Sequence, residues 1–289
     1  MVQFLSLDSD LGPAPERARA AGVLEGGGLI LLPQTPFEVL ASERDLIDPA
    51  VLTPKSKNVS LDPASGEVGG SSVEGERREA MRAMIARYAD FAEGLIGEIL
   101  PGYSGALQRR RTSFRPGAVD TRALSPRKDD RRLHVDAFPS SPVQGRRILR
   151  VFSNVDPMGR DRVWEVGNDD FETFARSLSG RLQGRSETVR GLMQALKITR
   201  GRRTAYDQAM LELHDGAKLD DAWQAAAPRT RLAFPAGSSW IVYTDGSLHA
   251  ALSGQHAFEQ TYLLPVEAMY HPERSPLRAL ERVTGRALV

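Results

Sequence analysis

The chain has 289 residues, 41% of them hydrophobic, which suffices for one large globular domain or two small ones. Its 38 basic and 37 acidic residues nearly cancel, so the overall charge does not indicate a nucleic-acid partner. The chain has no cysteine, which excludes disulfides, cysteine-ligated zinc, iron–sulfur clusters and thiol nucleophiles.

The N-terminal sequence lacks the basic segment and apolar core of an export signal. No apolar run approaches the roughly 18 residues needed to span a bilayer. Cysteine-free composition fits a reducing compartment. We therefore expect a soluble, cytoplasmic protein, and peripheral contact with the inner membrane surface stays open.

We expect the N-terminal part, residues 1–105, to flank the main domain. A glycine turn leads into an apolar run at 26–40 that is typical of a buried strand, and the turn formers of 52–74 predict a long loop. Apolar side chains, several of them methionines, recur at helical spacing over 75–100, and Pro101 ends the pattern. Such a stripe indicates core packing rather than a cofactor site.

The rest of the chain alternates strand-like and helical segments. Strand patterns occur at 131–138, 146–155, 162–167, 230–246 and 249–264, and helical patterns at 169–182 and 204–227. Closely spaced strands on both sides of a helical insert favour an α+β fold with a jelly-roll core. We expect a single domain over 1–289, with jelly-roll strands in 106–168 and 228–266, a helical insert at 169–227 and a C-terminal extension at 267–289.

The segment RRLHVDAFPSSP at 131–142 contains a histidine and an aspartate two residues apart, His134 and Asp136. Alternate residues of a strand point to the same face, so both side chains could reach one metal ion. Non-haem Fe(II) oxygenases use two histidines and one carboxylate and leave positions open for a cosubstrate and O2. The motif alone is weak, and an ordinary surface strand that carries a histidine is the alternative.

The third ligand must be another of the five histidines. His249 follows a strand and a tight Asp-Gly turn and begins a new strand, a position typical of ligands at the mouth of a barrel. His256 lies deeper in the same strand-like run and is the second candidate. His214 is on a helical segment and His271 precedes a proline near the C-terminus, so both fit less well.

An iron oxygenase of this type normally binds 2-oxoglutarate, whose far carboxylate needs an arginine or lysine inside the barrel. Arg150 lies in an apolar strand segment, where alternation puts it on one face with Phe152 and Asn154. A buried guanidinium is costly without an anion, so we predict that Arg150, with Asn154 beside it, binds 2-oxoglutarate. An internal salt bridge or an exposed edge strand is the alternative, and Arg147 and Arg162 are next in line for this role.

Longer segments carry more information than the motif. The two main ones are DDRRLHVDAFPSSPVQGRRILRVFSNVDP at 129–157 and WIVYTDGSLHAALSGQHAFEQTYLLP at 240–265. Further segments are KNVSLDP (57–63), TSFRP (112–116), YDQAMLELHDGAKLD (206–220) and SPLRALE (275–281). Together they resemble the Kdo hydroxylases, Fe(II)/2-oxoglutarate dioxygenases that act on 3-deoxy-D-manno-oct-2-ulosonic acid (Kdo) in bacterial lipopolysaccharide.

The resemblance implies a double-stranded β-helix that holds iron through His134, Asp136 and His249 and uses 2-oxoglutarate and O2. It implies a lipid-linked Kdo sugar as substrate, hydroxylated at C3 with release of succinate and CO2. One departure concerns the anion site. Many 2-oxoglutarate enzymes carry an arginine a short distance past the distal histidine, where this chain reads FEQTY (258–262).

Two basic stretches lie close to the motif, QRRRTSFRP at 108–116 and RKDDRR at 127–132. Arg115 and Arg122 are candidates for binding the carboxylate or phosphates of the substrate, and the cluster Arg109–Arg111 for attraction to an anionic membrane. A solvated basic face is the alternative for each stretch. Two other functions stay open: the same chemistry on another small acid or a protein, and a non-catalytic metal-binding scaffold.

Overall fold

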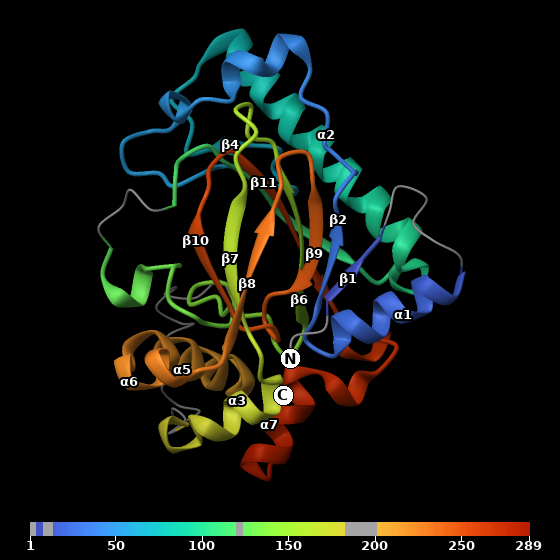
Figure 1. Cartoon of the computed structure of the whole chain (residues 1–289), viewed down its shortest axis with the longest axis vertical. Helices are drawn as coiled ribbons and strands as arrows, with labels where there is room; N and C mark the ends of the chain where they lie inside the picture. The colour runs from blue at the N-terminus through green and yellow to red at the C-terminus, as the bar shows by residue number, and fades with distance from the viewer. Residues whose placement is uncertain (1–3, 8–13, 120–123, 183–200) are drawn as a thin grey trace.

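Two β-sheets face each other in this protein, whose computed structural model describes residues 4–7, 14–119, 124–182 and 201–289 (Figure 1). The larger sheet has the spatial order β1 (Phe4–Ser6), β2 (Leu29–Leu32), β9 (Ser239–Tyr243), β6 (Arg147–Asn154), β11 (Ala257–Leu264), β5 (Gln108–Arg115), β3 (Val59–Leu61) and β4 (Val68–Gly69). The smaller sheet has the order β10 (His249–Ser253), β7 (Arg162–Gly167) and β8 (Arg229–Phe234). Two facing, mostly antiparallel sheets are the jelly-roll arrangement that the sequence predicts.

Aromatic side chains from both sheets fill part of the space between them. Phe152 of β6 stacks on Trp240 of β9 with 5.2 Å between ring centroids, and Trp164 of β7 meets Trp240 edge-on at 5.6 Å. The whole cluster consists of Leu29, Leu31, Phe152, Trp164, Val166, Phe234, Trp240, Val242 and Ala251. Such aromatic contacts hold the two sheets in register and leave the remaining inner surface for a site.

Helices cover the outer face of the larger sheet and one end of the sheets. α1 (Ala14–Glu25) and α2 (Gly75–Ile99) lie against the outer face, and α2 spans nearly all of the predicted 75–100. At the lower end in Figure 1 lie α3 (Phe171–Ser177), α5 (Ala205–Leu219), α6 (Asp221–Ala226) and α7 (Pro276–Thr284). Asp170 caps α3, since its side chain accepts from Thr173 N at 2.7 Å.

Short 3-10 helices connect the larger elements. They are η1 (Ala41–Leu46), η2 (Pro49–Val51), η3 (Pro101–Tyr103), η4 (Pro126–Lys128), η5 (Ser179–Arg181), η6 (Val266–Ala268) and η7 (Pro272–Arg274). The predicted loop at 52–74 is only partly a loop, because it contributes β3 and β4 to the edge of the larger sheet. Likewise the predicted strand at 26–40 is limited to the four residues of β2.

The prediction of a strand at 131–138 is wrong. Within this stretch the structure has one isolated bridge, in which the backbones of His134 and His249 exchange hydrogen bonds of 3.0 and 2.9 Å. Asp136 N adds a bond of 2.8 Å to Thr244 O. Pro139 and Pro142 follow this stretch and have no N–H to donate, so a ladder cannot continue past residue 138.

Gly254 brings the end of β10 very close to β7. Its φ is +105°, and a Cβ at this position would lie only 2.8 Å from the Cα of Arg162. We expect Gly254→Ala to lower the free energy of unfolding by about 1–3 kcal/mol in denaturant titrations. Gly66→Ala is the control, because Gly66 also has a positive φ (+70°) but open space around it. Equal losses in the two variants would show that the contact with β7 contributes nothing.

Candidate metal centre

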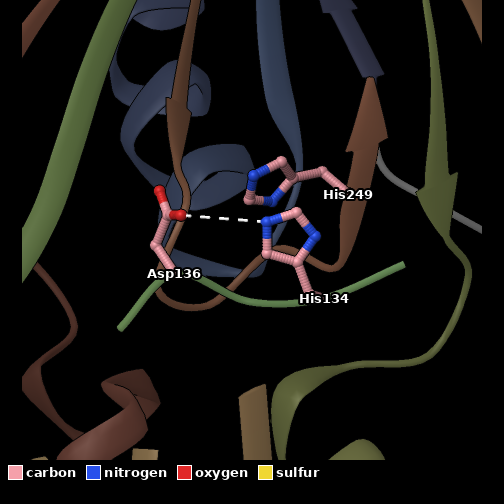
Figure 2. A group of neighbouring side chains, drawn as sticks. All are labelled: His134, Asp136 and His249. Atoms are coloured by element: carbon pink, nitrogen blue, oxygen red, sulfur yellow. Dashed lines mark ion pairs between the residues drawn. The ribbon is translucent and has the colours of Figure 1, made fainter. Parts of the chain in front are cut away.

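His134, Asp136 and His249 come together at the end of the smaller sheet. His249 is the first residue of β10, the reciprocal backbone bridge fixes His134 beside it, and Asp136 follows two residues later. One ligand atom from each side chain lies within 4.8 Å of the others (Figure 2). The backbone therefore brings the three predicted ligands around one point, although the expected strand is absent.

Both imidazoles direct the same nitrogen to this point. His134 Nδ1 lies 2.7 Å from Arg132 O and His249 Nδ1 lies 2.9 Å from Ser247 O. A carbonyl oxygen can only accept, so each Nδ1 carries the proton and each Nε2 keeps a free lone pair. Backbone carbonyls of this kind orient histidine ligands in metal sites.

The charge states also suit a divalent cation. Burial lowers the pKa of both His134 and His249, so both rings are neutral near neutral pH. Burial alone would raise the pKa of Asp136, but Arg150, with Nη2 3.0 Å from Oδ2, holds it well below its ordinary value. Two neutral imidazoles and one carboxylate are the donor set of non-haem Fe(II) sites, so these residues fit the ion.

A cavity of about 170 Å³ opens beside the three ligands, and we call it the inner cavity. Four basic side chains are among its lining residues: Lys57, Arg115, Arg150 and Arg162. Trp164 forms part of the wall and stacks on the His249 ring with 5.3 Å between centroids. Four acidic side chains line it as well: Asp129, Asp130, Asp136 and Glu259. The basic and acidic groups balance in number, so a small anion is favoured only beside a base that has no acidic partner.

Arg150 and Phe152 both line the inner cavity, so the predicted face of β6 is confirmed for these two residues but not for Asn154. Its guanidinium, however, already has two acidic partners: Asp136 and Glu259, the latter at 2.8 Å from Nη1. The predicted alternative of an internal salt bridge is therefore present in the structure. Asn154 is turned away from the cavity, because its Nδ2 donates to Arg160 O and Phe234 O, both at 2.9 Å.

Glu259 also lines the inner cavity, and it was not among the predicted site residues. Its carboxylate pairs with Arg150 and also accepts from Arg115 Nε at 2.7 Å and Nη2 at 2.6 Å. The signal was available, because Glu259 is an acid inside the strand-like run FEQTY, where alternation points it inward. Arg115 thus lines the inner cavity, and its role in substrate binding stays a prediction; Arg122 lies outside the described residues.

Arg162 is the basic residue of the cavity that the described residues leave unpaired. Its side chain comes from the first residue of β7, the residue is 4% exposed, and neither Nε nor Nη1 has a hydrogen-bond partner among the described residues. Burial, with a smaller effect of Arg115, lowers its pKa to about 10, so it is still charged at neutral pH. Arg147, the other reserve candidate, is bonded to Asp245 at 2.8 Å and does not line this cavity.

The remaining histidines do not reach the metal point. His256 has its Nδ1 3.1 Å from Asp156, on the far side of the turn after β10. His214 stands edge-on to His134 with 5.4 Å between ring centroids, but its Nδ1 is bonded to Asp215. His271 is half-exposed near Glu273.

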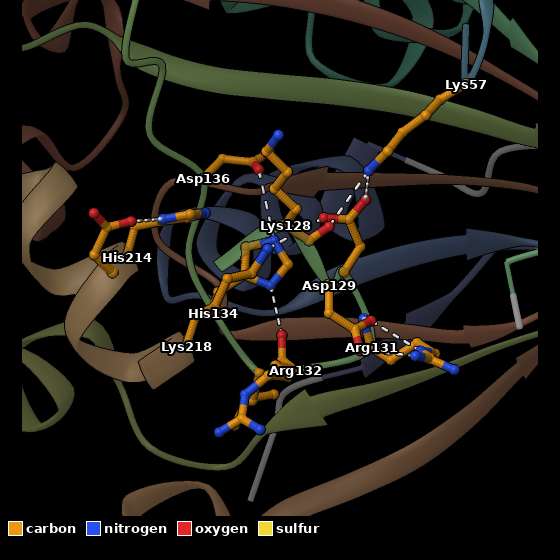
Figure 3. A network of polar contacts seen from close by, with 12 residues as sticks. Lys57, Lys128, Asp129, Arg131, Arg132, His134, Asp136, His214 and Lys218 are labelled. Carbon is orange, nitrogen blue, oxygen red and sulfur yellow. Dashed lines mark hydrogen bonds and ion pairs between the residues drawn. The ribbon is translucent and has the colours of Figure 1, made fainter. Parts of the chain in front are cut away.

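A polar network surrounds His134 (Figure 3). The buried Lys218 of α5 pairs with Asp130 at 3.1 Å, and Asp130 also lies 3.9 Å from Lys57. Burial opposes ionisation of Asp130, but Lys218, with smaller effects of Arg115 and Lys57, outweighs it and lowers its pKa to about 2. The sequence does not predict this pair, because α5 and the 127–132 stretch are far apart in the chain.

Two facing sheets that enclose two histidines and one carboxylate define the class of jelly-roll non-haem Fe(II) oxygenases. The chain matches the model of the 3-deoxy-D-manno-oct-2-ulosonic acid (Kdo) hydroxylase family over residues 10–287. This chain belongs to the Kdo hydroxylase family.

Solved structures of the Kdo hydroxylase KdoO are similar to this chain at 40% sequence identity, over 99% of this chain and 97% of theirs. The complex with α-ketoglutarate and Fe(III) gives a TM-score of 0.94 and the complex with cobalt(II) one of 0.95. A third structure holds succinate and Fe(III), also with a TM-score of 0.94. No curated protein matches the chain.

Proposed function

We propose that this protein hydroxylates Kdo at C3 and uses Fe(II), 2-oxoglutarate and O2, with succinate and CO2 as the other products. The observation that carries the proposal is the convergence of two neutral Nε2 atoms and one ionised carboxylate beside a cavity rich in arginine. The family match and the ligands of the similar KdoO structures support the same reaction.

Each residue of the site has a proposed task. His134, Asp136 and His249 hold the iron, which when bound supplies the activation of O2. Arg150 fixes the Asp136 carboxylate through its ion pair and ties it to Glu259. The unpaired guanidinium of Arg162 pairs with the distal carboxylate of 2-oxoglutarate, a change from the role first predicted for Arg150.

Arg115 is our candidate for the carboxylate of the sugar. It lines the inner cavity, and 28% of its side chain is exposed, so it lies at the open side of the wall. Trp164 and Phe152 exclude water from the other side, which strengthens every charge interaction in the cavity.

Succinate production tests the reaction, and mass spectrometry of the sugar tests the substrate. Fe(II)-loaded protein with 2-oxoglutarate and O2 is expected to release succinate only when a Kdo sugar is present, and the sugar gains the mass of one oxygen atom. Succinate with an unchanged Kdo sugar would indicate another substrate. A metal-bound protein that makes no succinate with any sugar would be a scaffold.

We also propose that the Kdo sugar is lipid-linked and that the protein works in the cytoplasm against the inner membrane surface. No helix in the described part of the chain is long and apolar enough to cross a membrane. The cluster Arg109–Arg111 carries less free positive charge than its sequence indicates. Arg109 is paired with Asp90 and Glu93, and Arg111 with Asp62 at 3.5 Å.

Membrane attraction should therefore be weak and depend on salt. Co-sedimentation with anionic vesicles at low salt is expected to fall on the change Arg110→Glu, since one basic residue near such a surface contributes about 1 kcal/mol. Neutral vesicles are the control. Sedimentation that ignores both salt and this change would remove the membrane role of the cluster.

A further inference from the structure

Among the strands that the structure describes, only β10 pairs with the segment that carries His134. The backbone of His134 exchanges two hydrogen bonds with His249, the first residue of β10. In an extended chain the N–H and C=O groups of successive residues point to opposite sides, so those of Leu133 point away from β10. Leu133 is fully buried, and backbone groups without a partner are costly at such a position.

The side chain of Gln224, on α6, lies on this other side of the segment. Its Oε1 accepts from Leu133 N at 3.0 Å, and its Nε2 donates to Leu133 O at 2.8 Å. A residue of a neighbouring strand would offer the same donor and acceptor, so the side-chain amide replaces the missing strand. Nε2 also donates to Ala217 O at 3.0 Å, and because a carbonyl can only accept, this bond fixes the orientation of the amide.

Both bonds to Gln224 act on the peptide units that orient His134. Leu133 N shares a planar peptide unit with Arg132 O, which accepts from His134 Nδ1 at 2.7 Å (Figure 3). Leu133 O shares the next unit with His134 N, which donates to His249 O at 3.0 Å. Fixing these two planes therefore fixes the His134 ring beside the second histidine. A hydrogen bond to the N–H of a peptide unit also strengthens its carbonyl as an acceptor, which makes His134 Nε2 a better ligand.

α6 is itself attached at both ends, so Gln224 has a fixed position. At the beginning of the helix, Asp220 Oδ1 accepts from Trp223 N at 2.9 Å. At its end, Arg229 of β8 donates from Nε to Ala227 O at 3.1 Å and from Nη2 to Gln224 O. β8 and β10 belong to the same sheet. The two elements that hold the ligand segment from its two sides, α6 and β10, are therefore joined through one sheet.

We propose that Gln224 is a positioning residue for the metal ligand His134, and that α6 takes the place of a strand beside the ligand segment. This inference rests on the proposed iron site. Gln224 is not among the described residues that line the inner cavity. It should therefore act on metal binding through His134 and make no contact with 2-oxoglutarate or the sugar.

The test replaces Gln224 by methionine, which keeps the length of the side chain but removes the amide. Affinity for Co(II), measured by calorimetry, is expected to fall about tenfold, because loss of a group that supports a metal ligand costs about 10–100-fold. The visible absorption of the variant saturated with Co(II) should also differ from that of the unchanged chain, because the His134 ring is no longer held at one angle. A purely structural role would not change this spectrum once the metal is bound.

Gln255→Met is the matched control. Gln255 is also half-buried, and its Nε2 lies 3.0 Å from Nε2 of His256, which is not a proposed metal ligand. This change should leave both the Co(II) affinity and the spectrum as they are. Gln224→Ala should reproduce both effects of Gln224→Met, which separates loss of the amide from misfit of the methionine. Circular dichroism checks that each variant is folded.

Unchanged Co(II) affinity in both Gln224 variants, or an equal loss in Gln255→Met, would overturn the proposal. A lower affinity with an unchanged spectrum would mean general destabilisation and would overturn it as well. Weaker Co(II) binding and an altered spectrum in the Gln224 variants, with no turnover of Kdo by the unchanged chain, would support the role of Gln224 and refute the proposed reaction.

Discussion

Replacing His249 by alanine is expected to lower the affinity for Fe(II) or Co(II) by more than about a hundredfold, since even the loss of a group that only supports a metal ligand costs about 10–100-fold. Hydroxylation and succinate release should both disappear. The protein should stay folded, because His249 contributes one ring to a wall that Trp164 and the β10 backbone also hold. Co(II) titration, followed by absorption and calorimetry, measures the effect without requiring turnover.

His256→Ala is the matched control for this experiment. Both histidines are buried and belong to the same strand region, but His256 is bonded to Asp156, away from the metal point. Its loss should leave metal affinity unchanged. If instead His256→Ala loses Co(II) and His249→Ala retains it, the proposed ligand set is wrong.

Helices and strands are predicted best where the apolar residues of a whole segment recur with one helical or strand period. The helix at 75–100 and the strands at 146–155 and 162–167 match α2, β6 and β7 closely, because each has an apolar face that must be buried. The 131–138 stretch has strand-like residues but no neighbour to pair with along its length. Strand pairing depends on segments that are distant in the chain, so the local alternation of residues could not show that a strand is absent here. The single-domain organisation stays a prediction.

The candidate ligands could be predicted because they depend on spacing and position, not on distant partners. The assignment of the arginines could not. Arg150 is 109 residues from Glu259 in the chain, and only the pairing of β6 with β11 brings their side chains together. An arginine inside an apolar strand predicts a buried anion, but the sequence alone does not tell whether that anion is a ligand or a carboxylate of the protein.

Replacing Arg162 by leucine is expected to weaken 2-oxoglutarate binding at least tens-fold, since loss of a hydrogen-bonded charge partner in a buried site costs about 2–5 kcal/mol. The reason is that the guanidinium of Arg162 has no acidic partner among the described residues, whereas the other two arginines that line the inner cavity are paired with acids. Arg162→Lys should give an intermediate loss, because lysine keeps the charge but not the two parallel donors. Calorimetry of 2-oxoglutarate with the Co(II)-loaded protein measures this without turnover, and metal affinity should not change.

Arg150→Leu is the informative comparison, because the two arginines face the same cavity with different partners. It removes the ion pair that fixes Asp136, so it should weaken Co(II) binding first and 2-oxoglutarate binding only as a consequence. A loss of 2-oxoglutarate binding in Arg150→Leu at normal metal affinity, with none in Arg162→Leu, would return the carboxylate role to Arg150.

Thermal stability tests independently whether Arg162, rather than Arg150, binds the distal carboxylate of 2-oxoglutarate. A buried guanidinium without a bonded acid destabilises the ligand-free protein, so Arg162→Leu should leave Tm unchanged or raise it when 2-oxoglutarate is absent. Arg150→Leu should lower Tm, because it leaves Asp136 without its arginine and removes one of the two arginines that pair with Glu259. Adding 2-oxoglutarate to the Co(II)-loaded protein should then raise Tm in the unchanged chain but not in Arg162→Leu, since only a bound ligand stabilises the fold. A lower Tm for ligand-free Arg162→Leu would mean that Arg162 has a structural partner and that the distal carboxylate binds elsewhere.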